Sequence, residues 1–168
     1  MNKDTLNTIF FFVGLILLQI VVLNHINFLG YINPFLYILF IFYYPIKKID
    51  SQLIFLSFFL GLSIDIFSNS GGVNAAATLF IAFIRIPVLK SVIGKREIDS
   101  TINNINKLPY GKVFAYIIIL TFIHHFIVFG LEYFKWSNFG VIISKTLLTS
   151  VFTIILIMIS YTFIARKK

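Results

Sequence analysis

The sequence contains no cysteine and few charged residues, above all few acidic ones. Among 168 residues, 6 are Asp or Glu and 14 are Lys or Arg, and charged residues make up only 12% of the chain. Without cysteine, disulfides, thiolate metal sites and cysteine nucleophiles are excluded. Soluble domains are about 25% charged, so this chain has too little polar surface to cover itself in water. A soluble globular domain is therefore excluded.

What the sequence has instead is long apolar stretches, since 59% of its residues are hydrophobic and 21 are Phe. A helix needs about 20 apolar residues to cross the hydrocarbon, and five of the stretches are long enough. The other, residues 34–44, begins at Pro34 and is stopped by Pro45, as expected of a short helix wedged among the others. We predict an all-α integral membrane protein with a single domain, residues 1–168, and six transmembrane helices, of which the second is short. The predicted helices are residues 6–23, 34–44, 52–68, 73–93, 113–131 and 139–164.

The basic residues lie in short clusters between the apolar stretches, which is typical of cytoplasmic loops and argues against a nucleic-acid partner. With six spans, only Lys135 falls on the side away from the termini. Both termini are therefore expected in the cytoplasm. In a five-span arrangement, residues 34–44 only dip into the membrane. This arrangement would place only Lys3 on the wrong side of the membrane. The first stretch is too long for a signal peptide and lacks a small-residue cleavage site, so we expect it to stay attached. The basic residues assigned to the cytoplasmic side are Lys3, Lys47, Lys48, Lys90, Lys95, Arg96, Lys107, Lys112, Arg166, Lys167 and Lys168.

Ionisable residues inside a bilayer are costly and are candidates for function. Asp65 and Arg85 lie on consecutive helices, and each belongs to a stripe of small and polar residues at helical spacing. A turn at residues 69–72 joins the helices, which predicts an antiparallel hairpin with facing stripes. The depths of Asp65 and Arg85 argue against a direct ion pair. The two stripes are Ser57, Gly61, Asp65 and Ser68, and Asn74, Thr78, Ala82 and Arg85.

Two interpretations of this charged pair stay open. In one, Asp65 caps the turn at Gly72 and Arg85 extends towards the cytoplasm beside Lys90. In the other, both belong to a functional charge site inside the bundle. Pro87 is expected to kink or end the helix, which would free backbone carbonyls for Arg85.

The remaining polar residues in the apolar stretches predict no chemistry. His124 and His125 are adjacent and lie about 100° apart on a helix, so they cannot share a metal ion, and we expect polar packing. Lys145 is shallow enough to extend outward, where Glu132 could approach it. There is no nucleophile–base pattern, metal-binding motif or phosphate loop. The expectation is a protein that is not an enzyme and has no metal and no cofactor.

Residues 19–87 resemble the rod shape-determining MreD family. The likeness is carried by Asn24, Gly30, Pro34 and Pro45, then by Gly61, Asp65, Gly72, the Asn74-Ala75-Ala76-Ala77 run, Arg85 and Pro87. The resemblance implies a non-enzymatic scaffold in the bacterial inner membrane. It also implies MreC as a partner, with MreB filaments and the RodA and PBP2 peptidoglycan synthase pair in the same machinery. The structural or interaction candidates are Asn24, Pro34, Gly61, Asp65, Gly72, Asn74, Arg85 and Pro87.

The same resemblance implies a fold similar to the S components of energy-coupling-factor vitamin transporters. A vitamin-binding S component is accordingly the alternative function, although the first helix lacks the small-residue motif expected for its partner. For the scaffold, we expect the outer loops, residues 24–33 and 131–138, to meet MreC. The basic loop, residues 94–112, is either a solvated loop or a site for anionic lipid or a cytoplasmic partner.

Overall fold

The computed structural model describes residues 3–28, 32–46, 51–94, 105 and 108–166. The elements described are all helical apart from one isolated bridge between Phe28 and Ile32. The long helices are α1 (Lys3–Val21), α3 (Ser51–Ser68), α4 (Val73–Ile93), α6 (Tyr110–Glu132) and α7 (Phe139–Arg166). The short ones are α2 (Leu39–Tyr43) and the 3-10 turns η1 (Leu23–His25), η2 (Leu36–Ile38) and η4 (Trp136–Asn138).

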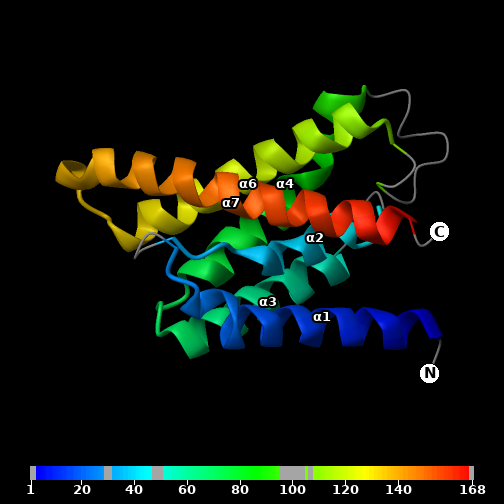
Figure 1. Ribbon diagram of the computed structural model, residues 1–168, viewed down its shortest axis with the longest axis horizontal. Helices are drawn as coiled ribbons and strands as arrows, with labels where there is room; N and C mark the ends of the chain where they lie inside the picture. Colours follow the sequence, from blue (N-terminus) through cyan, green and yellow to red (C-terminus); the bar gives the residue numbers. More distant parts are fainter. Residues whose placement is uncertain (1–2, 29–31, 47–50, 95–104, 106–107, 167–168) are drawn as a thin grey trace.

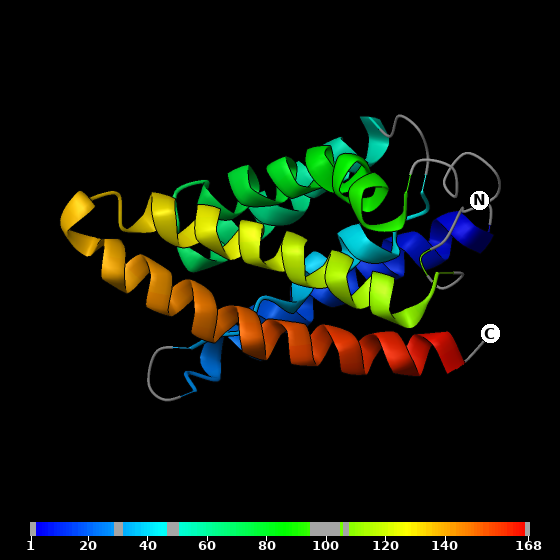
Figure 2. The same ribbon diagram turned by 90° about the horizontal axis from the view of Figure 1, so that it is seen from above.

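The five long helices run side by side along one axis, and both ends of the chain lie at the same end of the bundle (Figures 1 and 2). We call this the termini end, and the opposite one the turn end. Between α1 and α3 the chain returns from the turn end to the termini end through η2 and α2 (Figure 1). This second pass, residues 32–46, gives the described chain six passes, of which five are helices long and apolar enough to cross a membrane.

The distribution of side chains is the reverse of that in a soluble protein. Large apolar side chains cover the outside, among them Phe10, which is 72% exposed, and Phe83, which is 68% exposed. Such a surface would be unstable in water but is ordinary against lipid. Polar side chains are buried instead, and they are Gln19, Ser57, Asp65, Asn74, Thr78, Arg85, Thr121, His124, His125, Thr146, Thr149, Ser150 and Thr153.

The predicted helices agree closely with those observed. Helix α4 has the predicted bounds, and α3 begins one residue earlier than predicted. The clearest difference is in the second pass, where residues 34–44 were predicted to form one helix. Only Leu39–Tyr43 is α-helical, preceded by the 3-10 turn Leu36–Ile38. Several predicted residues lie outside the described residues, namely Gly30, most of the basic loop, and the cytoplasmic residues Lys47, Lys48, Lys95, Arg96, Lys107, Lys167 and Lys168.

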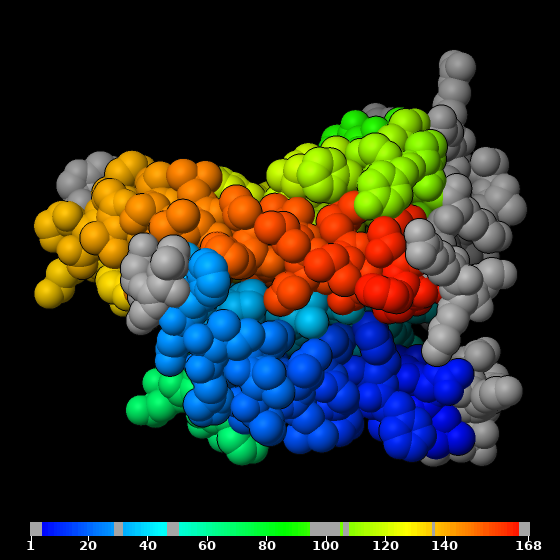
Figure 3. All heavy atoms as spheres, in the orientation of Figure 1, coloured from blue at the N-terminus to red at the C-terminus, as the bar shows by residue number. Residues whose placement is uncertain are grey.

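The hairpin of α6 and α7 extends beyond the α3–α4 turn at the turn end (Figure 1). In the space-filling view its tip stands out from the rest of that end (Figure 3). Phe134 at this tip is 84% exposed, and Phe139 is 49% exposed. The tip therefore presents two exposed aromatic side chains, Phe134 in the predicted outer loop, residues 131–138, and Phe139 at the start of α7.

Candidate functional site

Gln19 of α1 holds the start of the second pass. Its amide nitrogen donates to the Pro34 carbonyl at 3.0 Å and to Asn24 Oδ1 at 2.9 Å, and its oxygen accepts from the Tyr37 backbone N–H at 3.4 Å. Gln19 is fully buried. A non-helical backbone inside a membrane needs partners for its polar groups, and this side chain supplies two of them. Asn24, a predicted candidate, in turn donates to Ser68 Oγ at 3.0 Å.

Thr153 of α7 supplies a third partner for the second pass. Its hydroxyl oxygen accepts from the Phe35 backbone N–H at 3.0 Å and lies 3.1 Å from His125 Nε2. His125 Nδ1 lies 2.7 Å from the Thr121 carbonyl, which can only accept, so Nδ1 carries a proton. In the neutral ring, Nε2 then accepts from Thr153. The ring of His125 also stacks on Phe35 at a centroid distance of 5.1 Å.

Asp65 caps the N-terminus of α4. One carboxylate oxygen accepts from the Asn74 backbone N–H at 3.0 Å, the Asn74 side chain at 3.0 Å and the Ser70 hydroxyl at 2.5 Å. The other oxygen accepts from the Ala75 backbone N–H at 2.8 Å. An anion at a helix N-terminus satisfies orphan N–H groups and is favoured by the helix dipole. The capping interpretation of Asp65 is therefore confirmed.

Tyr37 links this cap to α6. Asn74 donates to Asp65 through its amide nitrogen, so its amide oxygen is free to accept the Tyr37 hydroxyl proton at 2.8 Å. The single hydroxyl proton is used there, and His124 Nε2, 3.1 Å away, must donate to the Tyr37 oxygen. Among the described residues, His124 Nδ1 is then buried without a hydrogen-bond partner. The predicted polar packing of the histidines is observed, and no group of three metal-ligating side chains occurs in the described ranges.

Arg85 is 1% exposed. Its side chain binds the backbone at the end of the second pass, opposite to the end that Gln19 holds. Its guanidinium donates to the carbonyl oxygens of Ile41 at 2.8 Å, Tyr44 at 3.3 Å and Pro45 at 2.7 Å. Ile41 lies in the last turn of α2, and Tyr44 and Pro45 follow that helix directly, where a cation also complements the helix dipole. The expectation that Arg85 extends towards the cytoplasm is wrong, because these buried carbonyls hold its head group inside the bundle.

The origin of those carbonyls also differs from the prediction. Pro87 was expected to free carbonyls of its own helix for Arg85, but α4 continues through Pro87 to Ile93, and the acceptors described above come from the end of the second pass, residues 41–45. Asp65 and Arg85 do not pair with each other. Asp65 binds the first turn of α4, and Arg85 binds the end of α2 three turns further along.

Two glycines allow the hairpin of α3 and α4 to form. A Cβ on Gly61 would lie 2.5 Å from Ala75 Cα and 2.5 Å from the Asn74 carbonyl oxygen, so only glycine fits this helix crossing. Gly72 immediately precedes α4 with φ of 93°, a left-handed conformation that suits glycine. The facing stripes predicted from the sequence are confirmed at this crossing.

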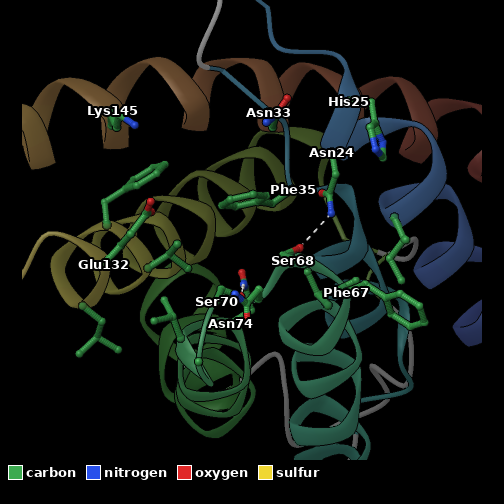
Figure 4. A pocket seen from close by; sticks show the side chains of 18 residues that line it. Asn24, His25, Asn33, Phe35, Phe67, Ser68, Ser70, Asn74, Glu132 and Lys145 are labelled. Atoms are coloured by element: carbon green, nitrogen blue, oxygen red, sulfur yellow. Dashed lines mark hydrogen bonds between the residues drawn. The ribbon is translucent and has the colours of Figure 1, made fainter.

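A pocket of about 840 Å³ opens at the turn end (Figure 4). Its lining includes the predicted candidates Asn24 and Asn74, and Phe35 lies between its walls. Lys145 also lines the pocket, with its ammonium against Tyr133 and Phe129. Glu132 lines the same pocket as Lys145, but within the described ranges no ion pair joins them, and Lys145 donates to the Tyr133 hydroxyl at 2.5 Å.

The sequence alone did not identify Gln19, Tyr37 or Thr153 as functional candidates, yet these side chains hold the second pass in place. A single Gln inside an apolar stretch is a signal that could have been used, since a buried amide needs partners.

The arrangement defines a multi-pass membrane protein of the all-α class, in which buried polar side chains hold a partly non-helical pass among five long helices. No family model matches the chain, and no curated protein and no solved structure matches it.

Proposed function

We propose that this protein is a non-enzymatic scaffold subunit of the bacterial cell-elongation machinery, acting with MreC in the inner membrane. One observation supports the proposal: residues of the MreD resemblance hold the second pass and the α3–α4 hairpin through buried hydrogen bonds. Asn24 is tied to Gln19, Asp65 and Asn74 cap α4, and Arg85 holds the end of α2.

These bonds give the bundle a defined shape. Buried polar groups that are fully hydrogen-bonded fix one arrangement of the elements around them. A scaffold needs this property, because its partners must find the same surface on every copy. The proposed partners are MreC first, then MreB filaments and the RodA and PBP2 synthase pair.

The projecting tip of α6 and α7 is the proposed contact for the membrane end of MreC. Phe134 lies between α6 and α7 and Phe139 begins α7, and both side chains are exposed. With the termini end in the cytoplasm, this tip lies on the outer side of the inner membrane. The other proposed outer loop, residues 24–33, is only partly within the described residues.

The experiment is gentle detergent extraction of the tagged protein from its native membrane, followed by mass spectrometry of co-purifying proteins. We expect MreC with a peptidoglycan synthase, and a reduced yield of both with Arg85→Ala. Lys90→Ala is the matched control, since Lys90 is an exposed cation on the same helix. Unchanged recovery of MreC with Arg85→Ala at equal expression contradicts a role of Arg85 in assembly. Absence of MreC from the wild-type sample contradicts the proposal itself.

A substrate-binding S component of a vitamin transporter is the second candidate, and the pocket at the turn end is the observation that favours it. In the topology proposed, this pocket opens on the outer side, where such a subunit takes up its substrate. The same extraction separates the candidates, because a transporter subunit would bring down ATPase subunits and a stoichiometric vitamin instead of MreC.

A further inference from the structure

The turn-end pocket has the size of a ligand site. Its volume of about 840 Å³ lies within the range of about 300–1,000 Å³ that is usual for small-molecule sites. Figure 4 shows Lys145 and Glu132 on one side, from α7 and α6, and Asn24 and His25 on the other, from η1. Phe35 lies between the two sides, which gives the pocket an apolar surface in its middle.

On the wall of the pocket formed by Ser70 and Asn74, the polar side chains already have hydrogen-bond partners within the protein. Ser70 donates to Asp65 and accepts from the Asn74 side chain. The Asn74 amide also donates to Asp65 and accepts from Tyr37. These groups therefore provide a rigid wall, and their hydrogen-bonding capacity is used within the protein.

Lys145 differs from these groups, because its ammonium has donors that the described residues do not use. Its ammonium lies 4.8 Å from the centre of the Tyr133 ring and 5.9 Å from that of Phe129. The aromatic faces and the Tyr133 hydroxyl hold it at the pocket wall. Of its three donors, the described structure uses one. No carboxylate within the described ranges pairs with it, so an anionic group of a ligand would complete its environment.

Glu132 adds the opposite charge to the same wall. Its carboxylate has no hydrogen-bond donor among the described residues, and its side chain is exposed in the pocket opening. A purely anionic ligand would meet Lys145 favourably and Glu132 unfavourably. A zwitterion matches both, with its anion at Lys145 and its ammonium at Glu132.

We propose that the turn-end pocket binds a small zwitterion, with a phosphate or carboxylate at the Lys145 ammonium and an amine at the Glu132 carboxylate. The zwitterion is either a free molecule or the phosphoethanolamine head group of a lipid, since the pocket lies where the apolar helices end. This inference concerns the pocket alone and does not depend on the cell-elongation proposal.

The test is native mass spectrometry of the purified full chain with three probes, namely phosphatidylethanolamine, phosphatidylglycerol and soluble glycerophosphoethanolamine. The wild type should bind phosphatidylethanolamine saturably and in preference to phosphatidylglycerol. Lys145→Met should weaken this binding at least about tenfold, the effect of losing one charge-assisted hydrogen bond. Lys135→Met is the matched control, since Lys135 is an exposed lysine of the same hairpin that does not line the pocket.

Two further variants keep the test decisive if Lys145→Met does not fold. Lys145→Arg keeps the charge and should retain binding. Glu132→Gln removes the acceptor for the amine and should abolish the preference for phosphatidylethanolamine over phosphatidylglycerol. Equal binding of glycerophosphoethanolamine and the whole lipid identifies a free zwitterion as the ligand, whereas binding of the lipid alone identifies a lipid head group.

Three results would overturn the inference. One is that none of the probes binds saturably to the wild type. Another is that Lys145→Met binds as well as Lys135→Met. The last is that phosphatidylglycerol competes equally with phosphatidylethanolamine in the wild type, which would leave Glu132 without a role.

Discussion

The guanidinium of Arg85 donates a 2.7 Å hydrogen bond to the carbonyl oxygen of Pro45, a residue 40 positions earlier in the chain. Two further bonds, to Ile41 and Tyr44, join the same side chain to the end of α2. A single residue of α4 thus binds three carbonyls at the end of the second pass.

Replacing Arg85 with Met should destabilise the protein by about 3 kcal/mol or more, since three buried carbonyls lose their donor at roughly 1–3 kcal/mol each. Arg85→Lys should recover only part of this loss, because an ammonium cannot reproduce the planar fork. The measurement is the thermal midpoint of the monodisperse peak in detergent. Lys90→Met should leave the midpoint unchanged; a similar fall in both variants would show that general loss of charge is responsible.

Asp65→Asn should destabilise the protein by about 1–3 kcal/mol, the cost of leaving a buried donor unpaired. A cap that used one oxygen would tolerate Asn, but here both oxygens accept hydrogen bonds. In the amide, the NH₂ group must face either the Ala75 N–H or the donors of Ser70 and Asn74. The same melting experiment measures the loss, with Glu132→Gln as control. A midpoint equal to that of the wild type would contradict the role of the second oxygen.

Gly61→Ala should force α3 and α4 apart, because the added methyl group would lie 2.5 Å from Ala75 Cα. Overpacking of this kind costs about 1–3 kcal/mol. Gly14→Ala is the control, since nothing lies within 4 Å of a Cβ at that position of α1. Gly14→Ala should be neutral or slightly stabilising, as alanine is the better helix former. If the two variants melt together, the close approach at Gly61 is not needed.

Gln19→Leu should loosen the second pass selectively. The variant leaves the Pro34 carbonyl and the Tyr37 N–H without their side-chain partner. We expect a loss of about 2 kcal/mol and faster hydrogen exchange in residues 32–46 than in the α3–α4 hairpin. Gln52→Leu, at an exposed position of α3, is the control. Uniformly faster exchange throughout the bundle would instead indicate global destabilisation.

The long helices could be predicted from the sequence because a bilayer demands a certain length of apolar residues. This length requirement does not apply to the second pass, which is shielded by neighbouring helices. The second pass combines α-helix, 3-10 turn and extended chain. Its backbone partners come from α1, α4 and α7, and no spacing within residues 34–44 reveals them.

The candidate site was predicted in part for the same reason. The capping role of Asp65 follows from sequence because its donors are only nine and ten residues away. Arg85 was identified as a candidate, but its partners were misplaced, since an arginine beside a lysine near a helix end usually extends towards water. Lys145 was also expected to extend outward, and only the positions of Phe129 and Tyr133 explain why it lines the pocket.

The dependence of the second pass on Arg85 has a consequence for biogenesis. When residues 32–46 leave the ribosome, α4 has not yet been made, and a helix of five residues cannot enter lipid by itself. We therefore expect the second pass to be taken up after translation has reached Arg85, when α3 and α4 are already in the bilayer. Membrane insertion is then expected not to follow the order of the sequence, and a nascent chain released before residue 85 should leave residues 32–46 accessible to protease.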